Sequence, residues 1–448
     1  MKVDHDRITA GIPMPEAELE IIGPQPPIQV APLPLEQPQA PHRFRTLQPL
    51  RHRNFMLFWN GALISNVGTW LQNVALSWLV LELTHSAFWV SMVTFCQFFQ
   101  TLMFGLFGGL VADRMDRRRV LLVTQTTQMT LAFALAAVTW SGHASVATLL
   151  PIIGLSGVSM AFNAPSFQAI IPDLIPQRLV IDAVSLNSTQ WSMARVVGPA
   201  LGGLLLKYYG AGWGFFVNGA TFLAVIAALF MIRTQRQDPP TSTGARALFG
   251  GVRSARETPA IAMLLGATAL VSLFGAPVLA LLPVMAHDVL GLGAGGFGGL
   301  FALFSCGAVV GALFTGTLVR RLGMRVTLVG GLVSLAVLIA AFGVSASLPL
   351  SACLLVGIGA VYTMSVSATS TGLQTSIPPR RRGRIMSLYM MAWGGLYPIG
   401  AVVAGYIATH LGAPATLKIM AVPLTIAAVV MWTFGGGLSL IVPPRTKR

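Results

Sequence analysis

Long apolar runs separated by short polar loops make up most of the chain. A helix that crosses a membrane needs about 20 mostly apolar residues, and twelve runs reach that length. The predicted spans are 54–82, 86–112, 120–141, 145–171, 182–207, 213–233, 259–286, 295–319, 326–345, 348–377, 385–410 and 414–435. The loops after the third, ninth and eleventh spans are very short. Spans 3 and 4, 9 and 10, and 11 and 12 are therefore expected to form tight antiparallel pairs.

The composition supports this interpretation. Of the 448 residues, 54% are hydrophobic and 10% are charged, and the mean hydropathy is +0.72. Soluble globular domains carry about 25% charged residues. The chain is therefore predicted to be an all-α membrane protein.

A short basic loop occurs twice, 207 residues apart, each time between two apolar runs. The first copy reads GGLVADRMDRRR from Gly108 to Arg119, and the second reads TGTLVRRLGMR from Thr315 to Arg325. The matching positions are Gly109 with Gly316, Arg114 with Arg321, and Arg118 with Arg325; in a later segment, Gln168, Ile171, Pro172 and Arg178 match Gln374, Ile377, Pro378 and Arg384. This repeat predicts twelve transmembrane helices in two six-helix bundles related by a parallel internal repeat. Many transporters share this plan, with the substrate path between the halves.

Residues 1–49 are rich in proline and polar residues and contain no apolar core. They show no signal-peptide pattern, and their composition predicts a disordered cytoplasmic tail. The expected organisation is this tail, an N-terminal bundle over 50–233, a cytoplasmic linker over 234–258, a C-terminal bundle over 259–436 and a cytoplasmic tail over 437–448.

The net charge of +15 is explained by its distribution along the chain. If the N-terminus is cytoplasmic, 24 of the 29 lysines and arginines lie on the inner side, close to the membrane. The outer side holds two, Lys207 and Lys418. This asymmetry follows the positive-inside rule for an even number of spans. We expect a multi-pass protein of the cell membrane with both termini in the cytoplasm and without a nucleic-acid partner.

Residue types that build metal sites, disulfides or enzyme active sites form no recognisable pattern. Cys96, Cys306 and Cys353 all lie inside predicted spans, which favours packing over disulfides or metal ligation. The seven histidines are scattered, and no Walker sequence for nucleotide binding occurs. We expect neither a metal nor another cofactor, and no enzymatic activity.

The first basic loop resembles the G-x-x-x-D-R-x-G-R-R loop that the major facilitator superfamily carries between its second and third helices. The resemblance rests on Gly109, Asp113, Arg114, Arg117 and Arg118. The chain departs from the family at Asp116, where glycine is usual, and this leaves the turn geometry open. The runs LRHRNFMLFW, GTWLQNVALSWLVLELTHSAF and RGRIMSLY resemble the subgroup that contains the enterobactin exporter and related efflux proteins. Together the resemblance covers roughly residues 47–435.

The resemblance implies the major facilitator fold and a gating role for the loop. In the family, the acid is thought to pair with arginines and with the positive end of a neighbouring helix, which latches the halves together in one state. Asp113 is the matching acid here. The alternative, that Arg114 to Arg119 only anchor the loop in the cytoplasm, stays open.

The fifth span carries the run ARVVGPALGG, which resembles the G-x-x-x-G-P-x-x-G-G motif that the family associates with exporters. The matching residues are Gly198, Pro199, Gly202 and Gly203, with Ala194 in place of the first glycine. Small residues let helix backbones approach closely, and the proline permits a bend. The motif favours export. The alternative is ordinary packing in a chain that has 47 glycines.

Charged side chains inside a membrane are costly and usually mark function, and Arg195 is the basic residue well inside a span. Helical spacing places Asn187 and Trp191 on its side of the fifth span, together with Gly198 and Gly202, and we expect this side to contact the other half. The remaining candidates for substrate binding or coupling are Asn66, Asn73, Gln97, Asn163, Tyr362, Tyr389, Trp393 and, near the outer end of the first span, Glu82. Arg195 is expected to bind an anionic group of the substrate. Alternatively, it is expected to favour the deprotonated form of a nearby proton carrier such as Glu82, if the fold brings the two together. A purely structural role for Arg195 stays open.

These features predict a secondary active exporter of a small amphipathic or aromatic molecule, such as a siderophore, drug or secondary metabolite. The expected mechanism is alternating access coupled to a proton, in a monomer surrounded by lipid. An importer of a small nutrient with the same fold is the alternative, and a membrane-embedded enzyme is a remote one.

The topology gives the first testable prediction. Reporter fusions or single cysteines at Gly142 and Ser347 should be accessible from outside the cell, because the charge distribution places both loops there. A cytoplasmic signal at both positions would contradict the twelve-span arrangement.

Overall fold

A computed structural model of the chain describes residues 45–232, 259–377 and 379–440. The predicted tail 1–49 lies largely outside the described residues, as do the linker 234–258 and most of the tail 437–448. All regular elements of the described part are helices. The fold-class prediction of an all-α protein is therefore confirmed.

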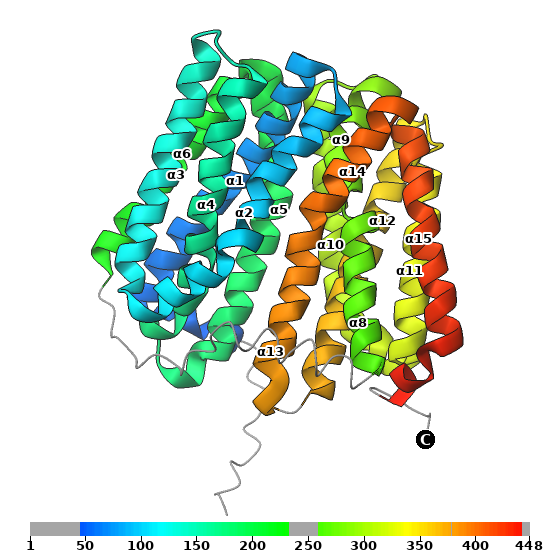
Figure 1. Ribbon diagram of the computed structural model, residues 1–448. Coiled ribbons are helices and arrows are strands. Elements are labelled where there is room, and N and C mark those ends of the chain that lie inside the picture. The colour runs from blue at the N-terminus through cyan, green and yellow to red at the C-terminus, as the bar shows by residue number, and fades with distance from the viewer. Residues whose placement is uncertain (1–44, 233–258, 378, 441–448) are drawn as a thin grey trace, which may run out of the picture. The chain divides into compact units, whose positions relative to one another are not determined.

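The N-terminal half consists of six long helices, shown from blue to green in Figure 1. They are α1 (Arg53–Thr84), α2 (Ala87–Arg114), α3 (Arg117–Trp140), α4 (Val146–Ala169), α5 (Val180–Tyr209) and α6 (Ala211–Met231). A short turn of 3-10 helix, η1 (Arg45–Arg51), precedes α1, and two more, η2 (Ile171–Leu174) and η3 (Gln177–Leu179), join α4 to α5.

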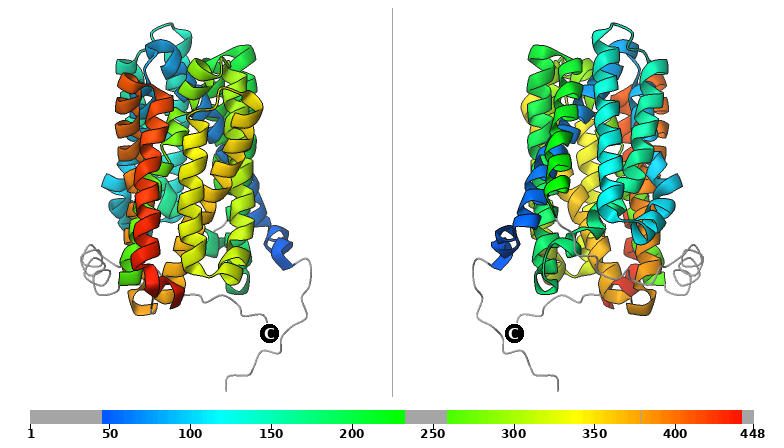
Figure 2. Two further views of the ribbon diagram at one scale, coloured as in Figure 1. Left: turned by 90° about the vertical axis from the view of Figure 1, so that its right-hand side faces the viewer. Right: turned by 90° about the vertical axis from the view of Figure 1, so that its left-hand side faces the viewer.

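The C-terminal half has the same number of spans, two of which are interrupted by π-helical turns. Its elements are α8 (Pro259–Leu270), η4 (Val271–Gly275), α9 (Val278–Val284), η5 (Met285–Val289), α10 (Ala294–Leu322), α11 (Met324–Phe342), α12 (Leu348–Ser376), α13 (Pro379–Met390), η6 (Met391–Gly395), α14 (Leu396–Leu411), α15 (Ala413–Phe434) and η7 (Gly435–Leu440). The two side views of Figure 2 show the C-terminal helices on one side and the N-terminal helices on the other. Helix α13 begins at 379, and the candidate membrane span within it and its continuation, Ile385–Leu411, agrees with the predicted span 385–410.

The two halves pack their helices in the same pairs. In the first half α2 packs against α4 and α3 against α6; in the second, α10 packs against α12 and α11 against α15. These are matching pairs under the sequence repeat, so the predicted internal duplication is present in the fold. The pairs α3 and α4, α11 and α12, and α14 and α15 also pack together, as their short loops predicted.

Ten segments of the described residues are long and apolar enough to cross a membrane. The two further long helices, α1 and α5, have 32 and 30 residues. At 1.5 Å per residue each exceeds the roughly 30 Å hydrocarbon core. They fall short in hydropathy because they carry the polar positions that the sequence singled out, including Asn66, Asn73, Asn187 and Arg195. Two of the helices that carry candidate site residues are thus less apolar than a typical span.

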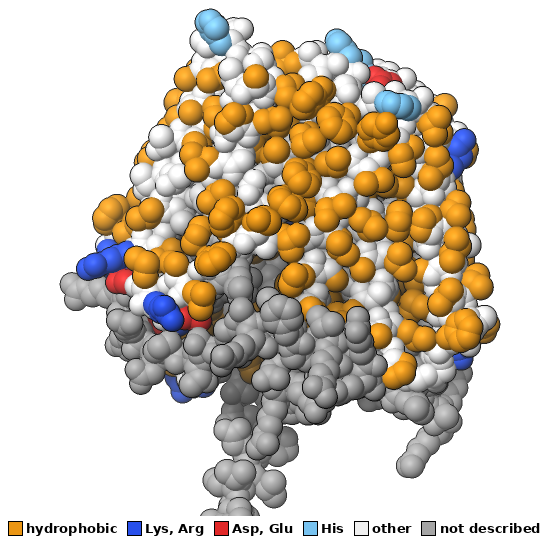
Figure 3. Space-filling view, in the orientation of Figure 1, with side chains coloured by type: hydrophobic (Ala, Val, Ile, Leu, Met, Phe, Trp, Pro, Cys, Tyr) orange, Lys and Arg blue, Asp and Glu red, His pale blue; other side chains and the backbone are white. Residues whose placement is uncertain are grey.

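Apolar side chains cover the face shown in Figure 3, between an end that bears histidines and the opposite end, where basic and acidic side chains are visible at the lower left. Many large apolar side chains of the described residues are exposed, among them Phe230, Leu313 and Phe434. An apolar exterior of this extent fits a lipid environment rather than water.

Close helix packing depends on glycine where α10 crosses α12. An added Cβ at Gly359 would collide with the backbone of Phe304 and lie 3.0 Å from the nitrogen of Ala308. Backbone atoms cannot move aside as a flexible side chain does. The crossing therefore requires glycine here.

The second prediction tests this contact. Gly359→Val should lower the melting temperature of the purified protein, because overpacking of this kind costs about 1–3 kcal/mol. Gly330→Val is the matched control, since an added Cβ at Gly330 meets nothing within 4 Å. Equal melting temperatures for the two variants in detergent would contradict the packing described.

Candidate functional site

The first basic loop is built around a helix cap. Asp116 is the N-cap of α3, and its carboxylate accepts hydrogen bonds from the backbone nitrogens of Arg118 at 2.9 Å and Arg119 at 3.3 Å. An acid at this position satisfies free amides and faces the positive end of the helix. The aspartate that replaces the family's glycine therefore gives the turn its own stabilising contact.

Arg117 forms the buried ion pair of this region. Its guanidinium lies 2.9 Å from the carboxylate of Asp173 in η2, and both side chains are largely buried. It also donates to the carbonyl of Ala169 at 3.0 Å. These contacts fasten the start of α3 to the end of α4. Asp173 was not among the residues predicted from the sequence, although it directly follows Ile171 and Pro172, which belong to the repeated segment.

Arg118 and Arg325 occupy matching positions in the sequence repeat. Each donates hydrogen bonds to backbone carbonyls near the end of the sixth helix of its half. Arg118 donates to the carbonyls of Leu229 at 2.5 Å and Phe230 at 3.1 Å, at the end of α6. Arg325 donates to the carbonyl of Trp432 near the end of α15, and its guanidinium carbon lies 4.8 Å from the Trp432 ring centroid. A cation is favourable at the C-terminal end of a helix. Each half thus uses an arginine at the start of its third helix to cap its sixth.

Asp113, the acid expected to act as a latch, is half-buried at the end of α2. It makes no hydrogen bond or ion pair with another described residue. Arg114 is exposed, and Gly109 has open space around it. The side chains of residues 380–384, a basic stretch near the start of α13, lie outside the described residues. The latch stays a prediction.

The two halves touch along α5 with α10 and along α2 with α14. An added Cβ at Gly203 on α5 would lie 2.8 Å from the Cα of Gly298 on α10, and one at Gly298 would lie 2.6 Å from the carbonyl oxygen of Pro199. In the second contact, an added Cβ at Gly405 on α14 would lie 2.8 Å from the carbonyl oxygen of Ala87 on α2. Both contacts are possible only because glycine has no side chain.

These crossings belong to a larger seam, which comprises Trp78, His85, Ala87, Phe88 and Gly203 of the first half and His287, Phe297, Gly298, Gly405 and Thr409 of the second. Trp78 stacks on Phe297 with ring centroids 5.9 Å apart. The backbone nitrogen of Phe88 donates to the hydroxyl of Thr409 at 3.2 Å. All these residues lie at the helix ends away from the basic loops. The structure is therefore closed at that end.

The glycines of the fifth-span motif face two different neighbours. Added Cβ atoms at Gly198 and Gly202 would lie 2.8 Å from the carbonyl oxygen of Val67 and 3.0 Å from that of Leu71, both on α1 of the same half. The prediction that this side of α5 contacts the other half is therefore wrong for these two glycines. Gly203 makes the contact instead, because one residue further along a helix turns the side chain by about 100°.

Arg195 lies between aromatic rings from both halves. Its guanidinium carbon is 5.4 Å from the Trp70 ring centroid on α1 and 5.4 Å from the Phe304 centroid on α10. Its Nε atom is buried and has no hydrogen-bond partner. Arg195 is thus held by aromatic faces rather than by an acid.

Glu82 does not reach Arg195. It is exposed near the end of α1, where it accepts a hydrogen bond from the indole nitrogen of Trp78 at 2.5 Å. Trp70, which contacts Arg195, lies twelve residues earlier, about 18 Å along the helix axis. The prediction that Glu82 serves as a proton carrier beside Arg195 required the fold to bring the two together, and in this structure they lie apart. More than three turns of α1 separate the two charges.

The other predicted site residues divide into two groups. Asn73 accepts from Gln97 at 2.8 Å, which joins α1 to α2, and Trp191 packs edge-on to Trp70 at 6.5 Å. Tyr362 packs against Phe304, which lies beside Arg195, and Asn66 lies one turn before Trp70 on α1. Trp393 is exposed, and its carbonyl accepts a hydrogen bond from the hydroxyl of Ser272. The remaining residues show no contact with Arg195. Tyr389 donates to the carbonyl of Val366 at 3.2 Å, Asn163 is buried, and Asn187 lies about two turns before Arg195 on α5.

The sequence analysis missed Phe301 and Phe304. Phe301 packs against Trp70 with ring centroids 6.0 Å apart, and Phe304 packs against Tyr362 at 6.2 Å. Both are apolar residues on an apolar helix, so nothing in the sequence distinguished them from residues that only pack between helices. Their position opposite Arg195 depends on how the halves dock.

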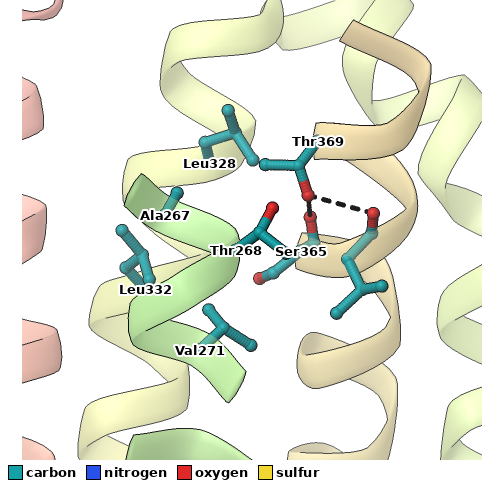
Figure 4. A pocket seen from close by; sticks show the side chains of 8 residues that line it. Ala267, Thr268, Val271, Leu328, Leu332, Ser365 and Thr369 are labelled. Carbon is teal, nitrogen blue, oxygen red and sulfur yellow. Dashed lines mark hydrogen bonds between the residues drawn. The ribbon is translucent and has the colours of Figure 1, made fainter. Parts of the chain in front are cut away.

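A small gap between α8, α11 and α12 is lined by polar as well as apolar side chains (Figure 4). It has no room for a water molecule. The hydroxyls of Thr268, Ser365 and Thr369 donate to carbonyls of their own helices, at 3.0, 2.9 and 2.7 Å respectively. This gap is part of the packing within the second half rather than a binding site.

Comparison with known proteins places the chain in a family. Residues 44–435 match the family described as "Transmembrane secretion effector". The chain belongs to this family, within the major facilitator superfamily. It is a transporter of small molecules with multiple membrane spans in the cell membrane, and not an enzyme.

Curated relatives cover nearly the same length. The chain is 24% identical to the "Staphyloferrin A transporter" of Staphylococcus aureus over 86% of this chain and 96% of that protein. It is 25% identical to the "Enterobactin exporter EntS" of Citrobacter koseri, over 86% and 93%. It is 24% identical to the "Multidrug efflux pump Tap" of Mycolicibacterium fortuitum, over 82% and 92%.

Solved structures share the fold. A bacterial homologue of the human lysosomal transporter Spinster, in an inward-facing and unoccupied conformation, has a TM-score of 0.65 at 15% identity and covers 90% of this chain and 100% of its own. A mutant of the nucleoside transporter NupG has a TM-score of 0.71 at 12% identity, covering 87% and 99%. At these identities the likeness establishes the fold alone, and it confirms the predicted major facilitator architecture.

The third prediction concerns the ion pair beneath the basic loop. Arg117→Ala should destabilise the purified protein by about 3 kcal/mol, because it leaves the carboxylate of Asp173 largely buried and unpaired. Arg119→Ala is the control: its pair with Asp116 is exposed, and exposed pairs contribute little. If both variants melt at the same temperature in detergent, the pair has no structural role.

Proposed function

We propose that this transporter is a secondary active exporter that moves a small amphipathic or aromatic molecule by alternating access. The observation that carries the proposal is the crossing of Gly203 and Gly298. It places the end of the fifth-span motif in direct backbone contact with the other half, at the end away from the basic loops. The names of the curated relatives, which include siderophore and drug exporters, support the same substrate range.

The orientation follows from charge. The basic loops would lie in the cytoplasm, and the closed seam would face outside, with both termini inside. In this state a substrate enters from the cytoplasm and stops beside Arg195, where Trp70 and Phe304 meet from opposite halves. Opening the seam and closing the basic side would then release it outward. Asp113 is the proposed latch for the basic side in the opposite state.

A coupling proton is supported by the titratable groups at the seam. Trp78 bonds to Glu82 and packs edge-on to His287 of the other half, with ring centroids 5.7 Å apart. His85 lies 6.5 Å from the same imidazole, and Asp288 bonds to it at 2.6 Å. Proton binding here would change the electrostatic balance between the halves where they separate.

The fourth prediction tests direction and the seam together. Cells that express the protein should retain less of an exported compound than cells without it. Gly298→Val should abolish this difference, because the closed seam cannot form around a larger side chain. Gly299→Val is the matched control on the next residue, where an added Cβ meets nothing within 4 Å.

Retention should be followed with a panel of dyes, siderophores and antibiotics, and both variants should be checked for equal abundance in the membrane. Export by Gly298→Val at the wild-type rate would contradict the role of the seam. Faster uptake of a nutrient, without efflux of any panel compound, would identify an importer instead.

A further inference from the structure

We infer that the transported substrate is an organic anion with several oxygen acceptors and a flat, apolar portion, bound at Arg195. The inference rests on the proposed function and specifies the chemistry of the same site. Four observations carry it: the charge balance around Arg195, the hydrogen-bond donors that lack acceptors, the aromatic walls, and the position of the site between the halves.

The charge of Arg195 is not balanced by an acid. The acidic side chains of the described residues all lie at or near helix ends: Glu82, Asp113, Asp116, Asp173, Asp182 and Asp288. Arg195 lies in the middle of α5, more than three turns from Asp182. An arginine stays protonated in proteins, and its charge deep in a membrane protein calls for a partner. The site therefore attracts an anion and repels a cation.

Hydrogen-bond donors without acceptors gather at the same place. The Nε of Arg195, the indole nitrogen of Trp70 and the amide nitrogen of Asn66 are all buried and without a partner. Asn66 and Trp70 are four residues apart and so lie on one face of α1. Buried polar groups are rarely left unpaired. A ligand that brings oxygen acceptors, such as carboxylate, phenolate or catecholate groups, would satisfy them.

Aromatic side chains enclose these donors. Trp70 packs against Trp191 and Phe301, while Phe304, the second ring beside the guanidinium, contacts Tyr362. A planar guanidinium stacks well on ring faces and binds carboxylates through two parallel hydrogen bonds. The same walls would accept a flat apolar portion of the substrate next to its anionic group.

The position of the site links binding to the transport cycle. Trp70 and Arg195 belong to the first half, and Phe304 and Tyr362 belong to the second. In the closed-seam state the guanidinium is held between Trp70 and Phe304. When the halves rearrange, Phe304 moves relative to Arg195, and an anionic substrate can take its place without leaving the cation unpartnered. The substrate class and the conformational change are then coupled through a single side chain.

Two dyes with the same planar ring system and opposite charge test this inference. Fluorescein is anionic and rhodamine 123 is cationic, and both are built on xanthene. The purified protein should bind fluorescein saturably and rhodamine 123 much more weakly, as measured by dye anisotropy. Arg195→Lys should weaken fluorescein binding about ten- to hundredfold, because the lysine keeps the charge but loses the paired hydrogen bonds.

Two further variants keep the test decisive if Arg195→Lys fails to fold. Trp70→Phe keeps a ring but removes the indole donor, and it should weaken fluorescein binding several-fold at unchanged melting temperature. Arg119→Lys, an exposed arginine at the start of α3, should bind fluorescein as the wild type does.

The inference is overturned if rhodamine 123 binds as tightly as fluorescein, if neither dye binds saturably, or if Arg195→Lys and Trp70→Phe leave fluorescein affinity unchanged. The export proposal has its own test in Gly298→Val and Gly299→Val. A protein that exports a cationic drug through the seam would refute the substrate class while leaving the direction of transport intact.

Discussion

The cost of placing charge in a membrane determines where the ionisable residues of this protein lie. In the described part of the chain, acids and most arginines occupy helix ends, where water, lipid head groups or backbone groups balance them. Arg195 is the exception in the middle of a span. Much of the central architecture can be understood as the environment that this one cation requires: rings on both sides, free hydrogen-bond donors beside it, and two halves that meet around it.

At the basic end of the molecule, arginines connect helices instead of lying between aromatic rings. Arg118 and Arg325 each cap the last helix of their half, while Arg117 holds Asp173 in a largely buried pair. Such contacts join the helices of each six-helix bundle to one another near the basic loops. The seam at the other end relies on glycine and aromatic packing between the bundles and contains few polar bonds. Rigid halves joined by a seam that can separate are what alternating access requires.

Much of the fold could be predicted from the sequence, because hydropathy and the internal repeat report helices directly. The predicted ends of the spans agree with the structure to within three residues, apart from the early start of α13. Helical periodicity placed Trp191 and Arg195 on one side of α5. It could not tell that Gly198 faces α1 and Gly203 faces α10, because periodicity fixes angles around one helix and not the identity of its neighbours. Phe304 and Asp173 were missed for the same reason: their roles arise from contacts between segments far apart in the chain.

The account depends on a seam that opens while the basic end closes, and distances between spin labels measure this directly. One label pair, at Trp89 and His410, would span the seam from α2 to α14, and a second pair, at Arg119 and Arg320, would span the basic end. The account predicts two distance populations for each pair, with the seam distance lengthening as the basic-end distance shortens when substrate or pH is changed. A single unchanging distance for both pairs, in a protein that still transports, would contradict it.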